Sequence, residues 1–331
     1  MSAHEESMKV LVDRLIEAKT CLALMGPTAS GKSRLSMALA ETLPIEIISV
    51  DSALIYKGMD IGTAKPTPEE MQAVPHHLID IIEPSESYSA ADFVEDVHRL
   101  VKEIFARGKL PVLVGGTMMY FNALQKGMAK LPSADESVRQ KIFEAWQADP
   151  QGMHAKLQSV DPQAAQRIHA NDSQRLTRAL EVYELTGKPL SQLQQEGEGE
   201  GLTEFKLCKV ALMTEDRKRL HHQIAKRFNE MISQGFLGEV KKLFQDKSLH
   251  ADLPSIRSVG YRQAWLFLSG DYDMETFIDK GIVATRQLAK RQITWLRKEQ
   301  QVLMLDPFEL SLSDQIEKVV EHLNLCLAEK G

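Results

Sequence analysis

The chain has 331 residues, of which 43% are hydrophobic, so it is long enough for two packed units or for one core that carries a large insertion. It contains no run of 18 apolar residues, and its first residues are acidic where a secretory signal would be basic. We therefore expect a cytoplasmic protein without a membrane partner. The formal net charge of −6 argues against indiscriminate nucleic-acid binding, although it says nothing about local basic patches.

The three cysteines, Cys21, Cys208 and Cys326, are scattered along the sequence. None belongs to a Cys-x-x-Cys pair, so the spacing indicates neither a zinc site nor a disulfide framework. We predict that all three are small buried apolar side chains.

Strand and helix patterns alternate in the first part of the chain. The predicted strands cover residues 21–25, 45–51 and 110–114, and the predicted helices cover residues 32–42, 90–107 and 117–126. Such alternation predicts an α/β fold, in which helices flank a parallel sheet. Ligands of these sheets gather outside the carboxyl ends of the strands, so residues that follow the predicted strands should lie near one another.

Helical patterns replace the strands from residue 132 to residue 193 and are best formed at 135–148 and 172–186. The Glu- and Gly-rich stretch at 196–201 is too polar to pack, and we predict a mobile connection there. Strand patterns return at 206–213 and 301–305. The predicted organisation is a first part of the core at residues 1–128, an all-helical insertion domain at 129–203, and a second part of the core at 204–331.

The most specific motif follows the first predicted strand. Residues 26–33 read GPTASGKS, a full match to the GxxxxGK[ST] pattern of P-loop proteins. Between a strand and a helix, this loop directs backbone N–H groups and a helix N-terminus at one anion, which predicts a diphosphate or polyphosphate ligand. Lys32 would supply charge to the phosphates, and the Ser33 hydroxyl would ligate Mg²⁺. The predicted diphosphate-binding residues of the loop are Gly26, Pro27, Thr28, Ala29, Ser30, Gly31, Lys32 and Ser33.

Two further turns follow predicted strands. Asp51 ends the strand at 45–51, where its carboxylate could hold Mg²⁺ through a water or could take a proton from a nucleophile. The strand at 110–114 ends in Gly115-Gly116-Thr117, which would let a substrate approach the backbone closely. Thr117 could donate a hydrogen bond to a phosphate or to a base.

A basic segment lies near the end of the chain. From Lys280 to Lys298 there are six Lys or Arg residues and no Asp or Glu. Helical spacing puts Arg286, Lys290 and Arg297 on one face. This face suits a partner lined with phosphates, although a solvated helix surface is the alternative.

Several strings in the sequence resemble the tRNA dimethylallyltransferases, also called tRNA isopentenyltransferases. Besides GPTASGKS, they are DSALIY from 51, DIGTAKP from 60, PHHLID from 75, VLVGGTMMY from 112, LPSAD from 131, NDSQRLTRALEVYELTGKP from 171, SVGYRQ from 258 and TRQLAKRQITWLR from 285. Their number and order make the resemblance specific, and it extends from the phosphate-binding loop through the basic helix.

The resemblance implies that a dimethylallyl group passes from dimethylallyl diphosphate to N6 of the adenine just 3′ of the anticodon in tRNA. Asp51 matches the general base of the family, and Lys32 and Thr117 complete the implied catalytic set. The phosphate-binding loop would hold the departing diphosphate with Mg²⁺, and Arg217 would contact the same group. One departure from the family pattern is Gln223, which stands where an arginine is expected between Arg217 and Arg227.

The resemblance also implies a set of tRNA contacts on both the insertion and the core. The adenine must leave its stack before it can reach Asp51. The implied tRNA-binding residues are Asp51, Ser52, Ala53, Leu54, Thr117, Arg139, Gln174, Arg175, Leu176, Thr177, Arg178, Arg257, Ser258, Val259, Gly260, Tyr261, Arg262, Arg286, Lys290 and Arg297.

Two other classes of protein also fit parts of the sequence. The alternating first part alone would fit a P-loop nucleoside or nucleotide kinase, but such an enzyme requires neither the basic helix nor the arginines of the insertion. A nucleotide-switched RNA-binding module would carry an [NT]KxD tetrapeptide, which is absent from the sequence. We expect a monomer.

Overall fold

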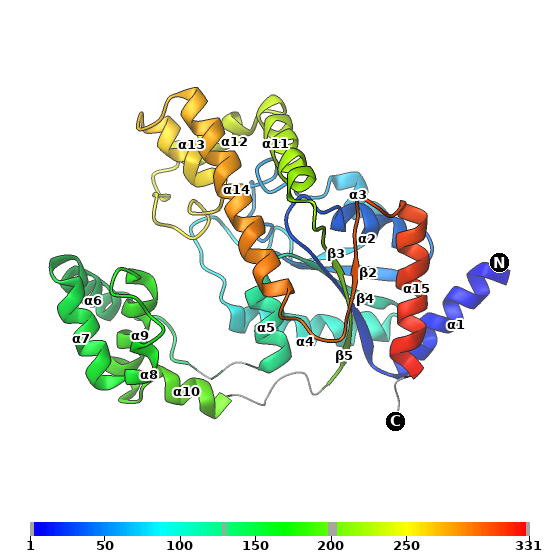
Figure 1. Cartoon of the computed structure of the whole chain (residues 1–331), viewed down its shortest axis with the longest axis horizontal. Helices are drawn as coiled ribbons and strands as arrows, with labels where there is room; N and C mark the ends of the chain where they lie inside the picture. Colours follow the sequence, from blue (N-terminus) through cyan, green and yellow to red (C-terminus); the bar gives the residue numbers. More distant parts are fainter. Residues whose placement is uncertain (1–2, 128, 130, 198–203, 329–331) are drawn as a thin grey trace. The chain divides into compact units, whose positions relative to one another are not determined.

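The computed structural model describes residues 3–127, 129, 131–197 and 204–328 (Figure 1). Residues 198–201 of the predicted mobile connection lie outside this described part. The chain divides into two compact units, one formed by Met1–Phe121 with Glu204–Gly331 and the other by Asn122–Thr203.

The larger unit contains one six-stranded sheet, in which every strand pair is parallel. Its strand order is β3-β2-β4-β1-β5-β6. The strands are β1 (Thr20–Met25), β2 (Ile45–Val50), β3 (His76–His77), β4 (Leu110–Gly115), β5 (Lys206–Leu212) and β6 (Val302–Leu305). All residues of β1 and β2 are buried, as expected for a parallel sheet covered by helices. The α/β fold predicted from the sequence is confirmed.

Helices α1 (Ala3–Glu17), α2 (Lys32–Ala40) and α15 (Leu312–Ala328) share one apolar core with the sheet. Alternate residues of the strands, such as Leu22 and Leu24 of β1, point into this core beside Leu35 of α2 and Leu323 of α15. Helix α4 (Ala90–Ala106) packs on β2 and β4, and its Phe93 stacks on Tyr120 of α5 (Met118–Lys126) at 4.4 Å.

A second apolar cluster in the same unit joins α11 (Arg217–Ser233), α12 (Phe236–Gln245), α13 (Tyr261–Leu268) and α14 (Met274–Leu296). These four helices lie side by side in Figure 1. Ile55, Tyr56 and Met59, which follow β2, are buried in the same cluster, so the segment after Asp51 is anchored on these helices. The short helix α3 (Pro68–Ala73) follows that segment.

The described part of the smaller unit contains helices and no strand. Its helices are α6 (Glu136–Ala148), α7 (Pro150–Val160), α8 (Pro162–Ala165), α9 (Ser173–Thr186) and α10 (Leu190–Gly197). The N-caps of α6, α7, α8 and α9 are all aspartates, each of which accepts a backbone N–H of the first turn. Leu157, Leu176 and Leu180 lie at the centre of its separate apolar core.

One prediction about the cysteines is wrong. Cys21 is free and buried, as expected, but Cys208 of β5 and Cys326 of α15 form a disulfide. These two residues are 118 positions apart, and only the packing of α15 on β5 brings them together. None of the described helices has the length and apolar character that crossing a bilayer requires.

Candidate active site

Three turns meet at the carboxyl edge of the sheet, because the strands that precede them are in register. Met25 of β1 pairs with Gly115 of β4, and Gly115 also pairs with Val50 of β2. The residues that follow these positions are the loop at 26–33, Asp51, and Gly116-Thr117. The expected proximity of the three turns is therefore observed.

The loop at 26–33 wraps around the N-terminus of α2. Gly31 is the N-cap residue, with φ of 88°, a left-handed conformation that glycine adopts without strain, and no side chain in the described ranges caps the helix. Lys32 folds back over the loop, and its Nζ donates to the carbonyl oxygen of Pro27 at 2.7 Å. The Ser30 hydroxyl is buried, and no hydrogen-bond partner for it exists among the described residues. A buried polar atom without a partner is uncommon and is a feature of sites that receive a ligand.

The ammonium of Lys32 is strongly perturbed by its surroundings. Burial and, to a smaller extent, the positive charge of Arg227 lower its pKa from 10.5 to about 7, although the Asp51 carboxylate acts in the opposite direction. The same carboxylate acts on Arg227, whose own pKa is lowered by burial. Two cations, Lys32 and Arg227, and the Asp51 carboxylate thus interact with one another near the start of α2. This arrangement suits an anionic ligand.

The carboxylate of Asp51 is held by the turn that it begins. Its Oδ1 accepts the backbone N–H groups of Ala53 at 2.8 Å and Leu54 at 3.4 Å. No residue within the described ranges donates to Oδ2. The backbone N–H of Ser52 donates to Thr117 Oγ1 at 3.1 Å, so the hydroxyl proton of Thr117 remains available to another acceptor. The Asp51 carboxylate and the Thr117 hydroxyl therefore both accept backbone N–H groups of the turn at 51–54, and each can still form a hydrogen bond with another group.

The close approach of β4 to β2 explains the glycine at position 115. A Cβ at Gly115 would lie 2.0 Å from the carbonyl oxygen of Val50, a distance that no side chain can adopt. Any side chain here would push the turn that carries Thr117 away from the turn that carries Asp51.

Gln292 of α14 connects two of these turns, although sequence reasoning did not assign it a role. Its Oε1 accepts the backbone N–H of Thr28 at 2.9 Å, and its Nε2 donates to the carbonyl oxygen of Gly116 at 2.9 Å. The residue lies within the TRQLAKRQITWLR string, but only the packing of α14 reveals which of its side chains reaches the sheet edge.

Arg217 and Arg227 belong to the same helix, α11, and are placed differently. Arg217 is the first residue of the helix and is exposed. Arg227 is three turns further on, half-buried, and close enough to act electrostatically on Lys32 and to respond to Asp51. The contact of Arg217 with a diphosphate stays a prediction, and Arg227 is the arginine of α11 that interacts electrostatically with Lys32 and Asp51.

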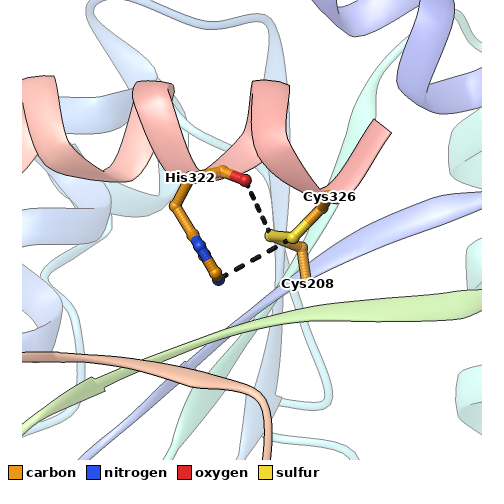
Figure 2. Close-up of side chains that lie close together, drawn as sticks. All are labelled: Cys208, His322 and Cys326. Carbon is orange, nitrogen blue, oxygen red and sulfur yellow. Dashed lines mark hydrogen bonds between the residues drawn. A yellow bond between two sulfur atoms is a disulfide. The ribbon is translucent and has the colours of Figure 1, made fainter. Parts of the chain in front are cut away.

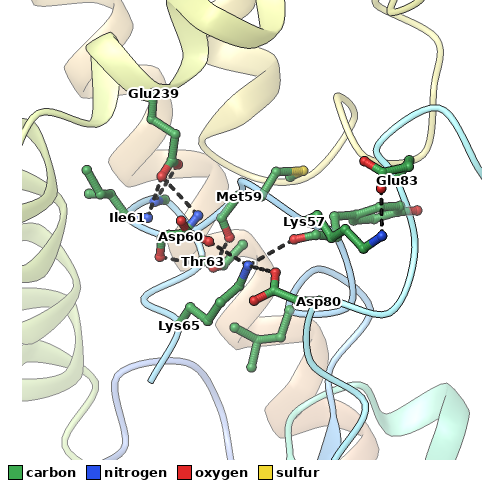
Figure 3. A network of polar contacts seen from close by, with 12 residues as sticks. Lys57, Met59, Asp60, Ile61, Thr63, Lys65, Asp80, Glu83 and Glu239 are labelled. Atoms are coloured by element: carbon green, nitrogen blue, oxygen red, sulfur yellow. Dashed lines mark hydrogen bonds and ion pairs between the residues drawn. The ribbon is translucent and has the colours of Figure 1, made fainter. Parts of the chain in front are cut away.

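A polar network fixes the segment that follows Asp51 (Figure 3). The Glu239 carboxylate of α12 accepts the backbone N–H groups of Asp60 at 2.9 Å, Ile61 at 2.7 Å and Gly62 at 3.2 Å. It also accepts the Tyr261 hydroxyl. Lys65, whose side chain is 4% exposed, contacts the carboxylates of Asp60 and Asp80 and donates to the carbonyl oxygen of Tyr56. Asp60 and Lys65, the charged residues of the DIGTAKP string, therefore have structural roles in this network.

The predicted tRNA-binding residues of the larger unit between Arg257 and Arg297 differ in how far they are exposed. Arg257, Arg262, Lys290 and Arg297 are exposed, and Arg297 pairs with Glu215 at 3.6 Å. Gly260 and Tyr261 are buried, so Tyr261 offers no surface to a partner in this conformation; Ser258 and Val259 are partly exposed. Arg286 is half-buried, and its Nε finds no partner in the described part of the chain.

The predicted tRNA-binding residues of the smaller unit also differ in exposure. Gln174 and Arg175 are exposed, whereas Leu176 and Thr177 are buried, and the Thr177 hydroxyl has no described partner. Arg139 and Arg178 both bind the fully buried carboxylate of Glu181, at 3.1 Å and 2.8 Å. Both arginines therefore hold the unit together, whatever else their remaining N–H groups contact.

The fold and the site define an α/β protein in which a phosphate-type loop and a carboxylate meet at one sheet edge. A family model described as IPP transferase matches residues 54–299. The chain belongs to this family of IPP transferases.

Proteins with closely similar sequences are known from bacteria. The tRNA dimethylallyltransferase of Hydrogenovibrio crunogenus is 72% identical over 313 residues, which cover 95% of this chain and 97% of that protein. The tRNA dimethylallyltransferase of Methylococcus capsulatus is 52% identical, with coverage of 92% and 97%.

Solved structures show the same fold. The tRNA isopentenylpyrophosphate transferase of Bacillus halodurans matches with a TM-score of 0.69 and 38% identity, covering 94% of this chain and 98% of that one. A eukaryotic dimethylallyltransferase described as acting on tRNA matches with a TM-score of 0.80 and 26% identity, covering 95% of this chain and 80% of that one.

Proposed function

We propose that this protein transfers the dimethylallyl group of dimethylallyl diphosphate to N6 of the adenine just 3′ of the anticodon in tRNA and releases diphosphate. Membership of the IPP transferase family supports a prenyl transfer, and the bacterial relatives that cover nearly the whole chain are tRNA dimethylallyltransferases. The observation that carries the proposal is the meeting of the loop at 26–33, Lys32 and Asp51 at one edge of the sheet.

The diphosphate binds in the loop formed by Gly26 to Ser33. Backbone N–H groups, the start of α2 and the Lys32 ammonium meet the charge that grows on the leaving oxygen as the carbon–oxygen bond breaks. Arg227, rather than Arg217, adds a second positive charge, because it is the arginine of α11 that interacts with Lys32 and Asp51.

A Mg²⁺ ion fits the same loop. The Ser33 hydroxyl at the start of α2 offers a hard oxygen ligand, and Mg²⁺ in proteins takes few protein ligands and completes its shell with substrate phosphates and water. The Ser30 hydroxyl is buried and has no partner among the described residues, which indicates that the loop has further polar capacity for the ligand. The ion would supply charge neutralisation to the diphosphate.

Asp51 acts as the general base. The amine of adenine is a weak nucleophile, because its lone pair is delocalised into the ring, so proton removal must accompany its attack on the allylic carbon. The free Oδ2 is the atom that takes this proton, and such a base contributes about 10²–10⁴ in rate. The Thr117 hydroxyl, which accepts from Ser52 and retains its proton, donates to the substrate beside it.

The tRNA presents the adenine in an unstacked conformation, over the turn at 51–54. The exposed basic residues of each unit, such as Arg175, Arg257 and Lys290, contact the phosphates of the anticodon stem-loop. Consistent with this partner, we place the protein in the cytoplasm, and we expect a monomer.

A kinase is not favoured, because the matched relatives are transferases that act on tRNA. The test uses an unmodified anticodon stem-loop with dimethylallyl diphosphate labelled in the allylic carbon, and in parallel with ATP labelled in the γ-phosphate. We expect label in the RNA only from the allylic donor. Transfer of the γ-phosphoryl group to any acceptor, with no allylic label in the RNA, would overturn the proposal.

A further inference from the structure

The disulfide between Cys208 and Cys326 has an imidazole beside it (Figure 2). His322 precedes Cys326 by four residues on α15, so both side chains leave the same face of the helix. The His322 Nε2 atom lies 3.7 Å from Cys326 Sγ, and Cys208 Sγ lies 3.7 Å from the carbonyl oxygen of His322. Among the described residues, the donor atoms of these three side chains form a cluster within 4.8 Å of one another.

We propose that Cys208, His322 and Cys326 form a zinc site when the two cysteines are reduced, and that oxidation to the disulfide abolishes it. The site is separate from the candidate active site. Cys208 lies four residues before Leu212, whose carbonyl oxygen faces Gly26 of the phosphate-type loop, and four residues of strand span about 13 Å.

The ligand set selects the class of cation. Two thiolates and one imidazole suit Zn²⁺, whereas Mg²⁺ and Ca²⁺ require oxygen ligands. Zinc bonds of about 2.3 Å to sulfur and 2.0–2.1 Å to nitrogen place tetrahedral ligands about 3.6 Å apart. The observed separation of His322 Nε2 and Cys326 Sγ is 3.7 Å, so these two ligands already have the spacing that a shared ion demands.

The change from the Cys208–Cys326 disulfide to the zinc-bound form balances in electrons and protons. Reduction by a dithiol breaks the Sγ–Sγ bond, transfers two electrons and two protons to the cysteines, and leaves the dithiol as its own disulfide. Zinc binding then releases two thiol protons to solvent as the thiolates form. A reducing cytoplasm would keep the pair in the form that binds the ion.

His322 has to change its hydrogen bond when the ion binds. Its Nε2 lies 3.1 Å from the carbonyl oxygen of Lys209 and donates to it whenever it carries the ring proton. A metal ligand requires the tautomer with the proton on Nδ1. Cys208 is 1% exposed and sits in the core shared with α15, so the ion would fasten the last turns of this helix to β5.

The test measures zinc in the full-length protein after reduction with a dithiol and removal of the reductant. We expect about one tightly bound Zn²⁺ per reduced chain, none in the oxidised chain, and no retention of Mg²⁺. Cys208→Ser and Cys326→Ser should each weaken zinc binding at least ~10²-fold. Cys21→Ser is the matched control, because Cys21 is also buried but stands apart from the cluster, and it should retain the ion.

Two further measurements test whether these side chains bind the ion or only lie near it. His322→Asn should weaken zinc binding at least ~10-fold while the number of thiols released on reduction stays the same. Cobalt should give thiolate-to-metal charge-transfer absorption in the reduced wild-type protein but not in the Cys208→Ser variant. The proposal fails if the reduced wild-type protein holds no more zinc than the Cys208→Ser/Cys326→Ser variant, if Cys21→Ser loses the ion, or if His322→Asn binds it unchanged. None of these readouts depends on prenyl transfer.

Discussion

Lys32 carries a charge that its surroundings disfavour, because burial and Arg227 lower its pKa to about 7. A bound diphosphate would raise this pKa again, since it brings opposite charge. Above pH 7 the free protein must therefore take up a proton when it binds the ligand, and the affinity for diphosphate should fall about tenfold per pH unit until the pKa of the bound state is reached.

Calorimetry of diphosphate binding in buffers of different ionisation enthalpy measures this proton directly. We expect uptake of nearly one proton at pH 8.5 and little at pH 6, and no such difference in Lys32→Met. Equal proton uptake at both pH values would contradict the assignment of this proton to Lys32.

The same depressed pKa of Lys32 makes the folded state less stable at low pH. The cost in the free energy of unfolding is complete below pH 7 and is relieved as the pH rises toward the ordinary pKa of 10.5.

Asp51→Asn tests the base while keeping the turn, because an amide oxygen can still accept the N–H groups of Ala53 and Leu54. We expect the single-turnover rate of prenyl transfer to fall at least ~10²-fold. The affinity for the stem-loop should remain within about tenfold. A variant that reacts at nearly the wild-type rate would show that another group accepts the proton.

Arg227 and Arg217 offer a matched comparison on one helix. Arg227→Gln removes the cation beside Lys32, so we expect the KM for dimethylallyl diphosphate to rise at least ~10-fold. Arg217→Gln changes an exposed residue at the start of α11 and should leave this KM within about twofold. Steady-state kinetics at saturating tRNA would decide, and the opposite order of effects would restore Arg217 as the diphosphate ligand.

At the scale of secondary structure, the sequence predicted what local patterns determine. The strands at 21–25, 45–51 and 110–114 and the loop at 26–33 appear close to where periodicity and glycine spacing put them. Helix α3 and the two-residue strand β3 were not predicted, because they are too short to show a period. The contacts of Gln292, the electrostatic interaction of Arg227 with Lys32 and the Cys208–Cys326 pair were not predicted for another reason: each depends on helix packing between distant segments.

Glu239 links α12 to the segment at 60–62, so its carboxylate should matter for stability more than an exposed one. Glu239→Gln replaces an acceptor of three backbone N–H groups and the Tyr261 hydroxyl with a group that also carries donors. We expect a loss of about 1–3 kcal/mol in the free energy of unfolding, measured by urea denaturation. The control Glu317→Gln, at an exposed position of α15, should change it by less than about 0.5 kcal/mol, and equal effects would refute the role of the network.

For the molecule as a whole, tRNA binding is expected to draw on both compact units. Arg175 of the smaller unit and Lys290 of the larger one are exposed cations, and each phosphate contact adds to the salt dependence of binding. Arg175→Ala and Lys290→Ala should each weaken stem-loop binding and lower the slope of log affinity against log salt by about 1. Lys318→Ala on α15 should change neither quantity. Fluorescence anisotropy over a salt series measures both, and an unchanged slope in Arg175→Ala would remove the smaller unit from the interface.

The attacking atom can be identified with two stem-loops that differ by one amine. The first carries adenine just 3′ of the anticodon, and the second carries purine there, which has the same ring but lacks the exocyclic nitrogen. After incubation with dimethylallyl diphosphate and nuclease digestion, mass spectrometry should find the dimethylallyl group on N6 of that adenine and no modification of the purine RNA. Prenylation of the purine RNA, or of any other position in the first RNA at a similar rate, would contradict the account.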